Sequence, residues 1–357
     1  MRKNAEHAID KAGITQLVGQ VHAVAEQYHC HSGRVQRLSY DMNSNIAASV
    51  RDANFNKSPT QLQRLQGLSL AQHRPFGEVV LKWELCLAKQ TDSNTQNHES
   101  QVVDSSSLIH EGNLLQQLAG TECSPALLQT IEEEVIFLAH NWHLTILVLP
   151  YYPLGSLKNY IKNNELTQSQ KIAVVLAAAQ AVLALHQAGW SHGDLKPSNL
   201  LIKADELIMA EQPDWQLLLN DFALAMPIPT LSPTSSSITA SSISTTNSTA
   251  LIPPKGTPAY LAPECWQGQG TSIQSDIYAF GVMMFEILTG TKPYQINRSD
   301  TDTQEEVLHQ WAVVHCQQPI PKLPSAWQQY QPLLDGMLAK TKAKRCAEIV
   351  EIIRVIE

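Results

Sequence analysis

The sequence predicts an α+β protein with two lobes, a small β-rich lobe followed by a larger helical lobe. The length of 357 residues exceeds a single ordinary domain, which has about 100 to 200 residues. Apolar runs rich in β-branched residues at 79–83, 135–138 and 144–149 are typical of strands. Farther along, the Ala-rich stretch 172–185 and the apolar stretch 275–290 indicate helices. The β-rich part therefore comes first and the helical part second.

The composition argues against several classes of protein. A net charge of −8 and a pI near 5.9 oppose nucleic acid binding, which needs a concentrated basic face. Six cysteines without a C-x-x-C pair indicate reduced thiols and a cytoplasmic location. The N-terminus lacks the apolar segment of a secretory signal, and the apolar run 172–185 is shorter than the roughly 20 residues that span a bilayer. We therefore expect no membrane segment and no nucleic acid partner.

Residues 1–58 match no motif, and we expect them to form a partly helical N-terminal extension. Leu17, Val21, Val24 and Tyr28 recur at helical spacing, which predicts an amphipathic helix. Such a helix packs its apolar face on another surface. The extension is therefore the place to look for a regulatory partner.

The strand at 79–83 has Lys82 near its centre. A buried ammonium needs an anionic partner, whereas a lysine on the solvent face of an edge strand does not. Glu111 begins a helical pattern with leucines four and seven residues later, and it supplies such an anion. Gly112 costs that helix up to about 1 kcal/mol relative to Ala, which predicts a loosely held helix. The polar segment 88–107 reads as a flexible connection.

The second lobe begins with a predicted capping box at 167–170 and a helix that leads to residues 191–201, SHGDLKPSNLL. This loop resembles the catalytic loop of the protein kinases, H-R-D-x-K-x-x-N. In that family the acid accepts the substrate hydroxyl proton, the lysine balances phosphoryl charge, and the amide helps to hold magnesium. The resemblance implies that Asp194 and Lys196 are catalytic and that Asn199 is a metal ligand.

The apolar strand that ends on Asp221 is similar to the Asp-Phe-Gly motif of the family, which implies that Asp221 is the second Mg²⁺ ligand. A Ser/Thr-rich insertion at about 228–250 takes the place of the activation loop. Gly193 stands where kinases that depend on phosphorylation of this loop carry arginine. We therefore expect activity without phosphorylation there.

Residues 256–264, GTPAYLAPE, resemble the substrate-docking segment that ends in Ala-Pro-Glu. By this resemblance Thr257 is catalytic, because it bridges the catalytic acid and lysine, and with the lysine it favours Ser or Thr acceptors. Glu264 is expected to pair with Arg345, and Asp276 to hold the backbone of the catalytic loop.

The same resemblance implies a nucleotide site in the first lobe. Lys82 corresponds to the lysine that aligns the α- and β-phosphates, and Glu111 to its partner on helix αC. The further residues implied to bind ATP are Val80, Leu149, Pro150, Tyr152 and Leu201. The implied boundaries are 59–149 for the N-lobe, 150–155 for the hinge and 156–357 for the C-lobe.

One part of the family pattern is missing, and it leaves three interpretations open. Between Ser58 and Lys82 the only glycines are Gly67 and Gly77, so no G-x-G-x-x-G turn covers the phosphates. The sequence is identified as a Hanks-type Ser/Thr protein kinase, more like bacterial members, that uses ATP and Mg²⁺ on a protein substrate. The alternatives are a pseudokinase scaffold and a small-molecule phosphotransferase, whose aminoglycoside-kinase form has a similar His-Gly-Asp-Leu loop.

Overall fold

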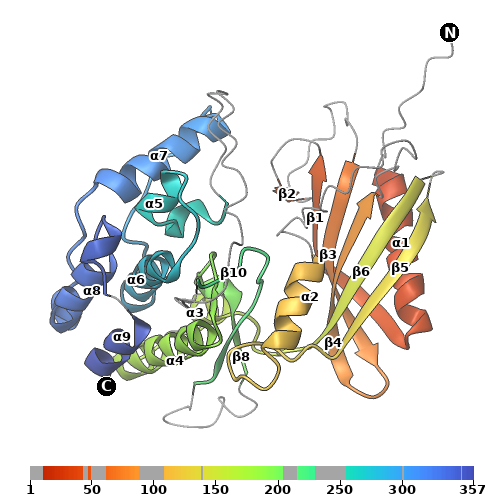
Figure 1. Ribbon diagram of the computed structural model, residues 1–357, viewed down its shortest axis with the longest axis horizontal. Helices are drawn as coiled ribbons and strands as arrows, with labels where there is room; N and C mark the ends of the chain where they lie inside the picture. The colour runs from red at the N-terminus through yellow and green to blue at the C-terminus, as the bar shows by residue number, and fades with distance from the viewer. Residues whose placement is uncertain are drawn as a thin grey trace, which may run out of the picture. The chain divides into compact units, whose positions relative to one another are not determined.

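The computed structural model describes residues 11–42, 47–49, 62–87, 108–137, 140–203, 215–229, 255–299, 301–346 and 348–357. The chain divides into two compact units (Figure 1). Unit 1 consists of Met1–Gly120 and Pro125–Pro153, and unit 2 of Thr121–Ser124 and Leu154–Glu357. Unit 1 is built on one large sheet and unit 2 mainly on helices, which confirms the predicted α+β class and the division into a β-rich and a helical lobe.

Unit 1 contains a six-stranded antiparallel sheet in the order β2-β1-β3-β4-β6-β5. Its strands are β1 (Cys30–Met42), β2 (Ala47–Ser49), β3 (Leu62–His73), β4 (Gly77–Leu87), β5 (Gln129–Phe137) and β6 (His140–Pro150). Among its described residues, two helices accompany the sheet, α1 (Lys11–Gln27) and α2 (Leu108–Gln117).

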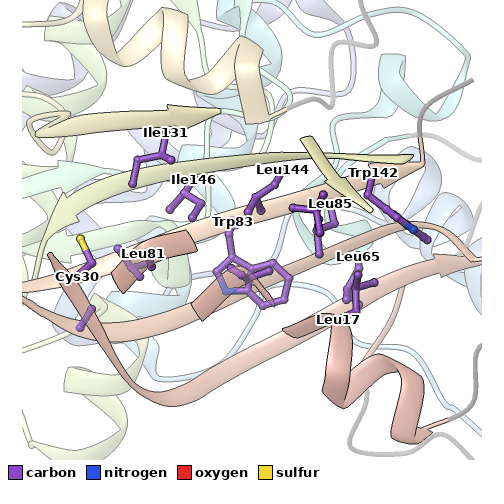
Figure 2. Packing of buried hydrophobic residues seen from close by; sticks show 14 of the residues in the cluster. Leu17, Cys30, Leu65, Leu81, Trp83, Leu85, Ile131, Trp142, Leu144 and Ile146 are labelled. Atoms are coloured by element: carbon purple, nitrogen blue, oxygen red, sulfur yellow. The ribbon is translucent and has the colours of Figure 1, made fainter. Parts of the chain in front are cut away.

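The core of unit 1 lies between α1 and the sheet. Because side chains alternate along a strand, Leu81, Trp83 and Leu85 of β4 share one face, and they are buried with Leu17 and Val21 of α1 (Figure 2). Lys82 and Glu84 lie on the other face, where both contact α2. The sheet is therefore covered by α1 on one side and by α2 on the other.

The residues expected to form an N-terminal extension contain parts of this sheet unit. The predicted helical spacing is confirmed by α1, whose apolar side packs on the sheet of its own unit. Strand β1 pairs with β3 from Cys30 opposite His73 onward. The sheet therefore starts at residue 30, inside the range 1–58.

Gly67 and Gly77 both lie in strands of the sheet of unit 1. Gly67 lies within β3 directly opposite Trp83, and a Cβ on Gly67 would lie 2.2 Å from Cζ2 of that indole. Gly77 begins β4 with φ of +74°. The first two long strands of the sheet are joined by residues 43–61, whose sequence contains no glycine.

Unit 2 holds seven α-helices among its described residues: α3 (Leu157–Asn163), α4 (Gln168–Gln187), α5 (Pro263–Trp266), α6 (Ile273–Thr289), α7 (Gln304–Gln317), α8 (Gln331–Met337) and α9 (Ile349–Ile356). Short strands β7 (Trp190–Ser191) and β10 (Met226–Pro227) form one pair, and β8 (Leu200–Ile202) and β9 (Leu217–Leu219) form another. The segment expected at 88–107 and residues 230–250 of the expected insertion lie outside the described residues.

Helix α4 starts at the predicted capping box, in which Thr167 and Gln170 exchange side-chain to backbone hydrogen bonds. It is longer than the apolar run 172–185, and by length and composition alone it could cross a membrane. In unit 2 many of its side chains are buried, including Val174, Val182 and Leu185, and it packs against α6 and α9.

Candidate active site

The loop after β7 is held by a buried carboxylate from α6. Asp276 accepts the backbone N–H of His192 on Oδ2 at 2.7 Å and that of Gly193 on Oδ1 at 2.9 Å. The Nε2 of His186 lies 3.0 Å from the same Oδ2. A carboxylate that is only 1% exposed requires such donors, because an unpaired buried charge is very unfavourable. The predicted role of Asp276 is confirmed.

Gly193 has a backbone conformation and surroundings that exclude a side chain. Its φ is +80°, and a Cβ there would lie 2.5 Å from the carbonyl oxygen of Leu224 and 3.1 Å from Cγ2 of Thr271. Only glycine adopts such a φ without strain. The loop therefore takes its shape from the absence of a side chain at this position.

His192 lies beneath the loop as a neutral, orienting group. Burial lowers the pKa of His192, although Asp276 opposes this shift. The backbone N–H of Asp194 donates to Nδ1 at 3.2 Å, and Nε2 lies 3.2 Å from the carbonyl oxygen of Asn220. Since a carbonyl only accepts hydrogen bonds, the tautomer protonated on Nε2 satisfies both contacts. His192 thereby ties Asp194 to the segment that carries Asp221.

Four predicted site residues meet in unit 2. Lys196 Nζ lies 2.5 Å from Asp194 Oδ2 and donates to Thr257 Oγ1 at 2.6 Å. The backbone N–H of Thr257 donates to Asp194 Oδ1 at 2.8 Å. Asn199 Nδ2 donates to the Asp194 carbonyl oxygen at 3.0 Å. Lys196 and Thr257 therefore orient the Asp194 carboxylate through its two oxygens. The amide oxygen of Asn199 is not used in these bonds and could serve as a metal ligand.

The backbone just before Asp221 is bonded to the catalytic loop, because Asn220 donates its N–H to the carbonyl oxygen of Asn199 at 2.9 Å. Asp221 has φ of +68°, a conformation that aspartate adopts more readily than most residues. The next residue, Phe222, is fully buried, with its ring 5.3 Å from that of His192. Phe222 thus anchors the segment that carries Asp221.

The docking segment is attached to the C-terminal part of unit 2 by the predicted pair of Glu264 and Arg345. Arg345 Nη1 and Nη2 donate to the two carboxylate oxygens of Glu264 at 2.6 and 2.7 Å. Arg345 also donates to the carbonyl oxygens of Ala339 and Gln274. Both side chains are buried, so the prediction of this ion pair is confirmed.

In unit 1, Lys82 of β4 and Glu111 of α2 form an ion pair with 2.6 Å between Nζ and Oε2. The lysine side chain is 20% exposed and that of the glutamate 1%. The expectation that Gly112 leaves this helix loosely held stays a prediction, but the structure gives a packing reason for the glycine. A Cβ at Gly112 would lie 2.9 Å from Cδ2 of Leu147 on β6, so the glycine allows the helix to approach the sheet closely.

The residues assigned to adenine binding lie in both units. Val80 and Leu149 are directly opposite on β4 and β6, Val79 is opposite Pro150, and burial raises the pKa of Tyr152. These belong to unit 1. Leu201 belongs to unit 2, where it pairs with Leu218 on β9. Their roles toward a nucleotide stay predictions.

The sequence reasoning missed Glu84, a buried acid two residues after Lys82. The period of two along a strand places it on the same face as the lysine, and that signal was available. It also missed the contact of His186 with Asp276, for which a sequence separation of 90 residues gives no signal.

Comparison with known proteins agrees with this geometry. The sequence profile of the protein kinase domain matches residues 84–354, well over half of the chain. The chain belongs to the protein kinase domain family. The match begins two residues after Lys82, so the assignment of that lysine rests on its pair with Glu111.

Curated relatives of this kinase domain include bacterial serine/threonine kinases. It is 27% identical over 199 residues to the probable serine/threonine-protein kinase PknB of Lactococcus lactis, covering 56% of this chain and 26% of that protein. It is 31% identical over 152 residues to PknB of Mycobacterium leprae, covering 42% and 21%. It is 30% identical over 187 residues to PknD of Mycobacterium tuberculosis, covering 51% of this chain and 23% of that protein. These relatives confirm the Hanks-type Ser/Thr class, and the matches cover about a quarter of their length.

Proposed function

We propose that this chain is a serine/threonine protein kinase that transfers the γ-phosphoryl group of ATP to a protein hydroxyl. The observation that carries this proposal is the cluster of Asp194, Lys196 and Thr257. Asp194 accepts the proton of the incoming hydroxyl, since its carboxylate is oriented by two donors. Lys196 supplies positive charge next to that carboxylate, and Thr257 fixes the lysine ammonium.

The oxygen ligands near this cluster suit magnesium. Asn199 and Asp221 offer an amide oxygen and a carboxylate, which are hard donors of the kind that Mg²⁺ takes together with phosphate oxygens and water. When bound, the metal neutralises charge on the transferred phosphoryl group. In unit 1, Lys82 is held by Glu111 and would bind the α- and β-phosphates of the nucleotide. On the adenine side, the family resemblance assigns Val80, Leu149, Pro150 and Tyr152 of unit 1, and separately Leu201 of unit 2.

A pseudokinase is the second candidate, because the connection between β1 and β3 has no glycine with which to cover phosphates. A small-molecule phosphotransferase is opposed by the docking segment and its ion pair with Arg345, which such enzymes do not need. We also propose a cytoplasmic, reducing location, which the six free cysteines support.

The test is transfer of label from radiolabelled ATP with Mg²⁺ to a generic protein substrate. Asp194→Ala should reduce the rate by roughly 10² to 10⁴-fold, whereas Ala at the partly exposed Asp335 should not. Transfer by Asp194→Ala at the wild-type rate would refute the mechanism. A thermal shift with ATP and Mg²⁺ distinguishes the pseudokinase from an active kinase. Ligand at 100 times its Kd stabilises the folded chain by about 2.7 kcal/mol, so a thermal shift without any transfer of label would indicate a pseudokinase that binds nucleotide.

A further inference from the structure

We propose that Glu84 is a positioning residue that fixes the first turn of α2 and thereby sets the pair of Lys82 and Glu111. The inference rests on the proposed function, because the importance of that pair is to hold a nucleotide. The polar partners of Glu84 are on β3, on its own strand and at the start of α2. Glu84 acts through the helix.

Glu84 is placed for this role by the alternation of β4. It lies two residues after Lys82 on the face of the strand that α2 covers, and only 2% of the residue is exposed. An acid buried to this degree requires hydrogen-bond donors or a positive partner. Those partners come from two different elements.

The two carboxylate oxygens divide between these elements. Oε2 accepts from Gln66 Nε2 at 2.5 Å and lies 3.5 Å from Arg64 Nε, both on the neighbouring strand β3. Oε1 accepts the backbone N–H of Leu108 at 3.3 Å and also a weak bond from Cys86 Sγ at 3.4 Å. Glu84 therefore connects the sheet to the first residue of α2.

The bond to Leu108 satisfies a group that the helix cannot satisfy itself. The first N–H groups of a helix have no partner within the helix, and its N-terminus carries partial positive charge that favours a carboxylate. Glu111 follows Leu108 by three residues, so both lie on the same side of α2. Fixing Leu108 against β4 therefore also fixes the rotation that directs Glu111 toward Lys82.

A purely structural role for the buried charge makes a different prediction from a positioning role. Glu84→Asp keeps the charge but is shorter by one methylene, so it cannot reach both β3 and Leu108. Glu84→Gln loses the charge but keeps the reach and an oxygen for Leu108, while the amide of Gln66 can rotate to accept. If Glu84 positions α2, the Glu84→Gln variant should keep the helix in place better than the Glu84→Asp variant. If only the charge matters, Asp is the better replacement.

The first experiment measures amide hydrogen exchange of residues 108–117 in the full chain without nucleotide. We expect faster exchange by at least about tenfold in Glu84→Asp and Glu84→Ala, corresponding to about 1.4 kcal/mol or more, and near wild-type exchange in Glu84→Gln. The control Glu134→Ala removes the same charge from a side chain of unit 1 that is 65% exposed, and it should change nothing. Unchanged exchange in Glu84→Asp, or faster exchange in Gln than in Asp, would overturn the proposal.

The second experiment measures the affinity for ATP with Mg²⁺ in a double-mutant cycle. If Glu84 acts through Glu111, Glu84→Asp weakens binding in the wild type but causes no further loss in Glu111→Ala, because the residue that it positions is already gone. An equal loss in both backgrounds would contradict this route. Failure of the wild type to bind nucleotide would count against the proposed function, and the exchange experiment would then decide on Glu84 alone.

Discussion

At the scale of single residues, the glycine of the catalytic loop carries two separate constraints, its positive φ and the nearby carbonyl of Leu224. Gly189 provides a matched control, because its φ is +87° but nothing lies within 4 Å of its Cβ position. Both Gly→Ala variants should lose about 1 to 2 kcal/mol from the left-handed backbone. Gly193→Ala should lose clearly more, and it should also lose phosphotransfer, as urea unfolding and label transfer would measure. Equal losses for the two variants would show that the contact with Leu224 is harmless.

Gly193 also bears on how the enzyme is controlled. Without a side chain at this position, a phosphate on the segment 230–249 has no cation here on which to dock. Replacing the Ser and Thr residues of that segment with Ala should therefore leave the rate of phosphotransfer nearly unchanged. A large loss of rate would show that the segment governs activity by another route.

At the scale of elements, α1 is part of the core of unit 1. Leu17 is fully buried against the sheet, whereas its neighbour Gln16 is exposed. Leu17→Ala should destabilise unit 1 by about 2 to 5 kcal/mol through lost burial and a residual cavity. Gln16→Ala should change the unfolding free energy by less than about 0.5 kcal/mol. Denaturant titration checks both, and a neutral Leu17→Ala would mean that α1 is not needed by the sheet.

The ion pair between α5 and the segment after η5 (Lys342–Lys344) gives a second prediction at this scale. Arg345→Ala leaves Glu264 as a buried charge without its main partner, so unit 2 should lose about 3 to 5 kcal/mol. The comparison is the ion pair of the exposed Lys322 with the partly exposed Asp335, 3.9 Å apart. Lys322→Ala should cost at most about 1 kcal/mol. Similar losses for the two variants in urea unfolding would contradict the importance of burial here.

The elements differ in how well the sequence predicted them. The capped helix α4 and the strand around Lys82 have strong local signals, and both were predicted. Strand β1 reads CHSGRVQRLSYDM and β3 reads LQRLQGLSLAQH, in which polar residues interrupt any clear alternation. These strands are fixed by pairing with each other from Cys30 opposite His73 to Met42 opposite Leu62. Such a non-local contact is not visible in any short window of sequence.

At the scale of the whole molecule, the stability of unit 2 should depend on pH through His315. Burial lowers the pKa of this histidine on α7 from 6.5 to about 3. Between these values the unfolded chain binds the proton and the folded chain does not, so stability is fully present above pH 6.5 and falls as the pH drops toward 3. The slope is at most about 1.4 kcal/mol per pH unit.

The measurement is denaturant unfolding at a series of pH values from neutral to acidic. His315→Gln should remove the part of the slope that this histidine contributes, while His309→Gln at an exposed position of the same helix should leave the slope in place. An unchanged slope in His315→Gln would assign the acid sensitivity to other groups.

The candidate site was predicted more fully than the sheet. In unit 2, the family motifs predicted a site that the structure brings together, made of Asp194, Lys196, Asn199 and Thr257. These residues could be predicted because the catalytic loop and the docking segment are each short and specific in sequence. The tautomer of His192 and the two-sided attachment of Glu84 could not be predicted in this way. Both depend on hydrogen bonds to backbone groups of other segments, and the pattern of residue types along the sequence does not show where those groups lie.

The contact of Gly67 with Trp83 has a consequence for how this sheet can evolve. Any side chain at position 67 would overlap the indole ring, since even a Cβ would lie 2.2 Å from it. Conversely, a smaller residue in place of Trp83 would leave a void above the glycine. The two positions should therefore change together among descendants of this chain, and a lineage that gains a side chain at 67 must first, or at the same time, give up the tryptophan.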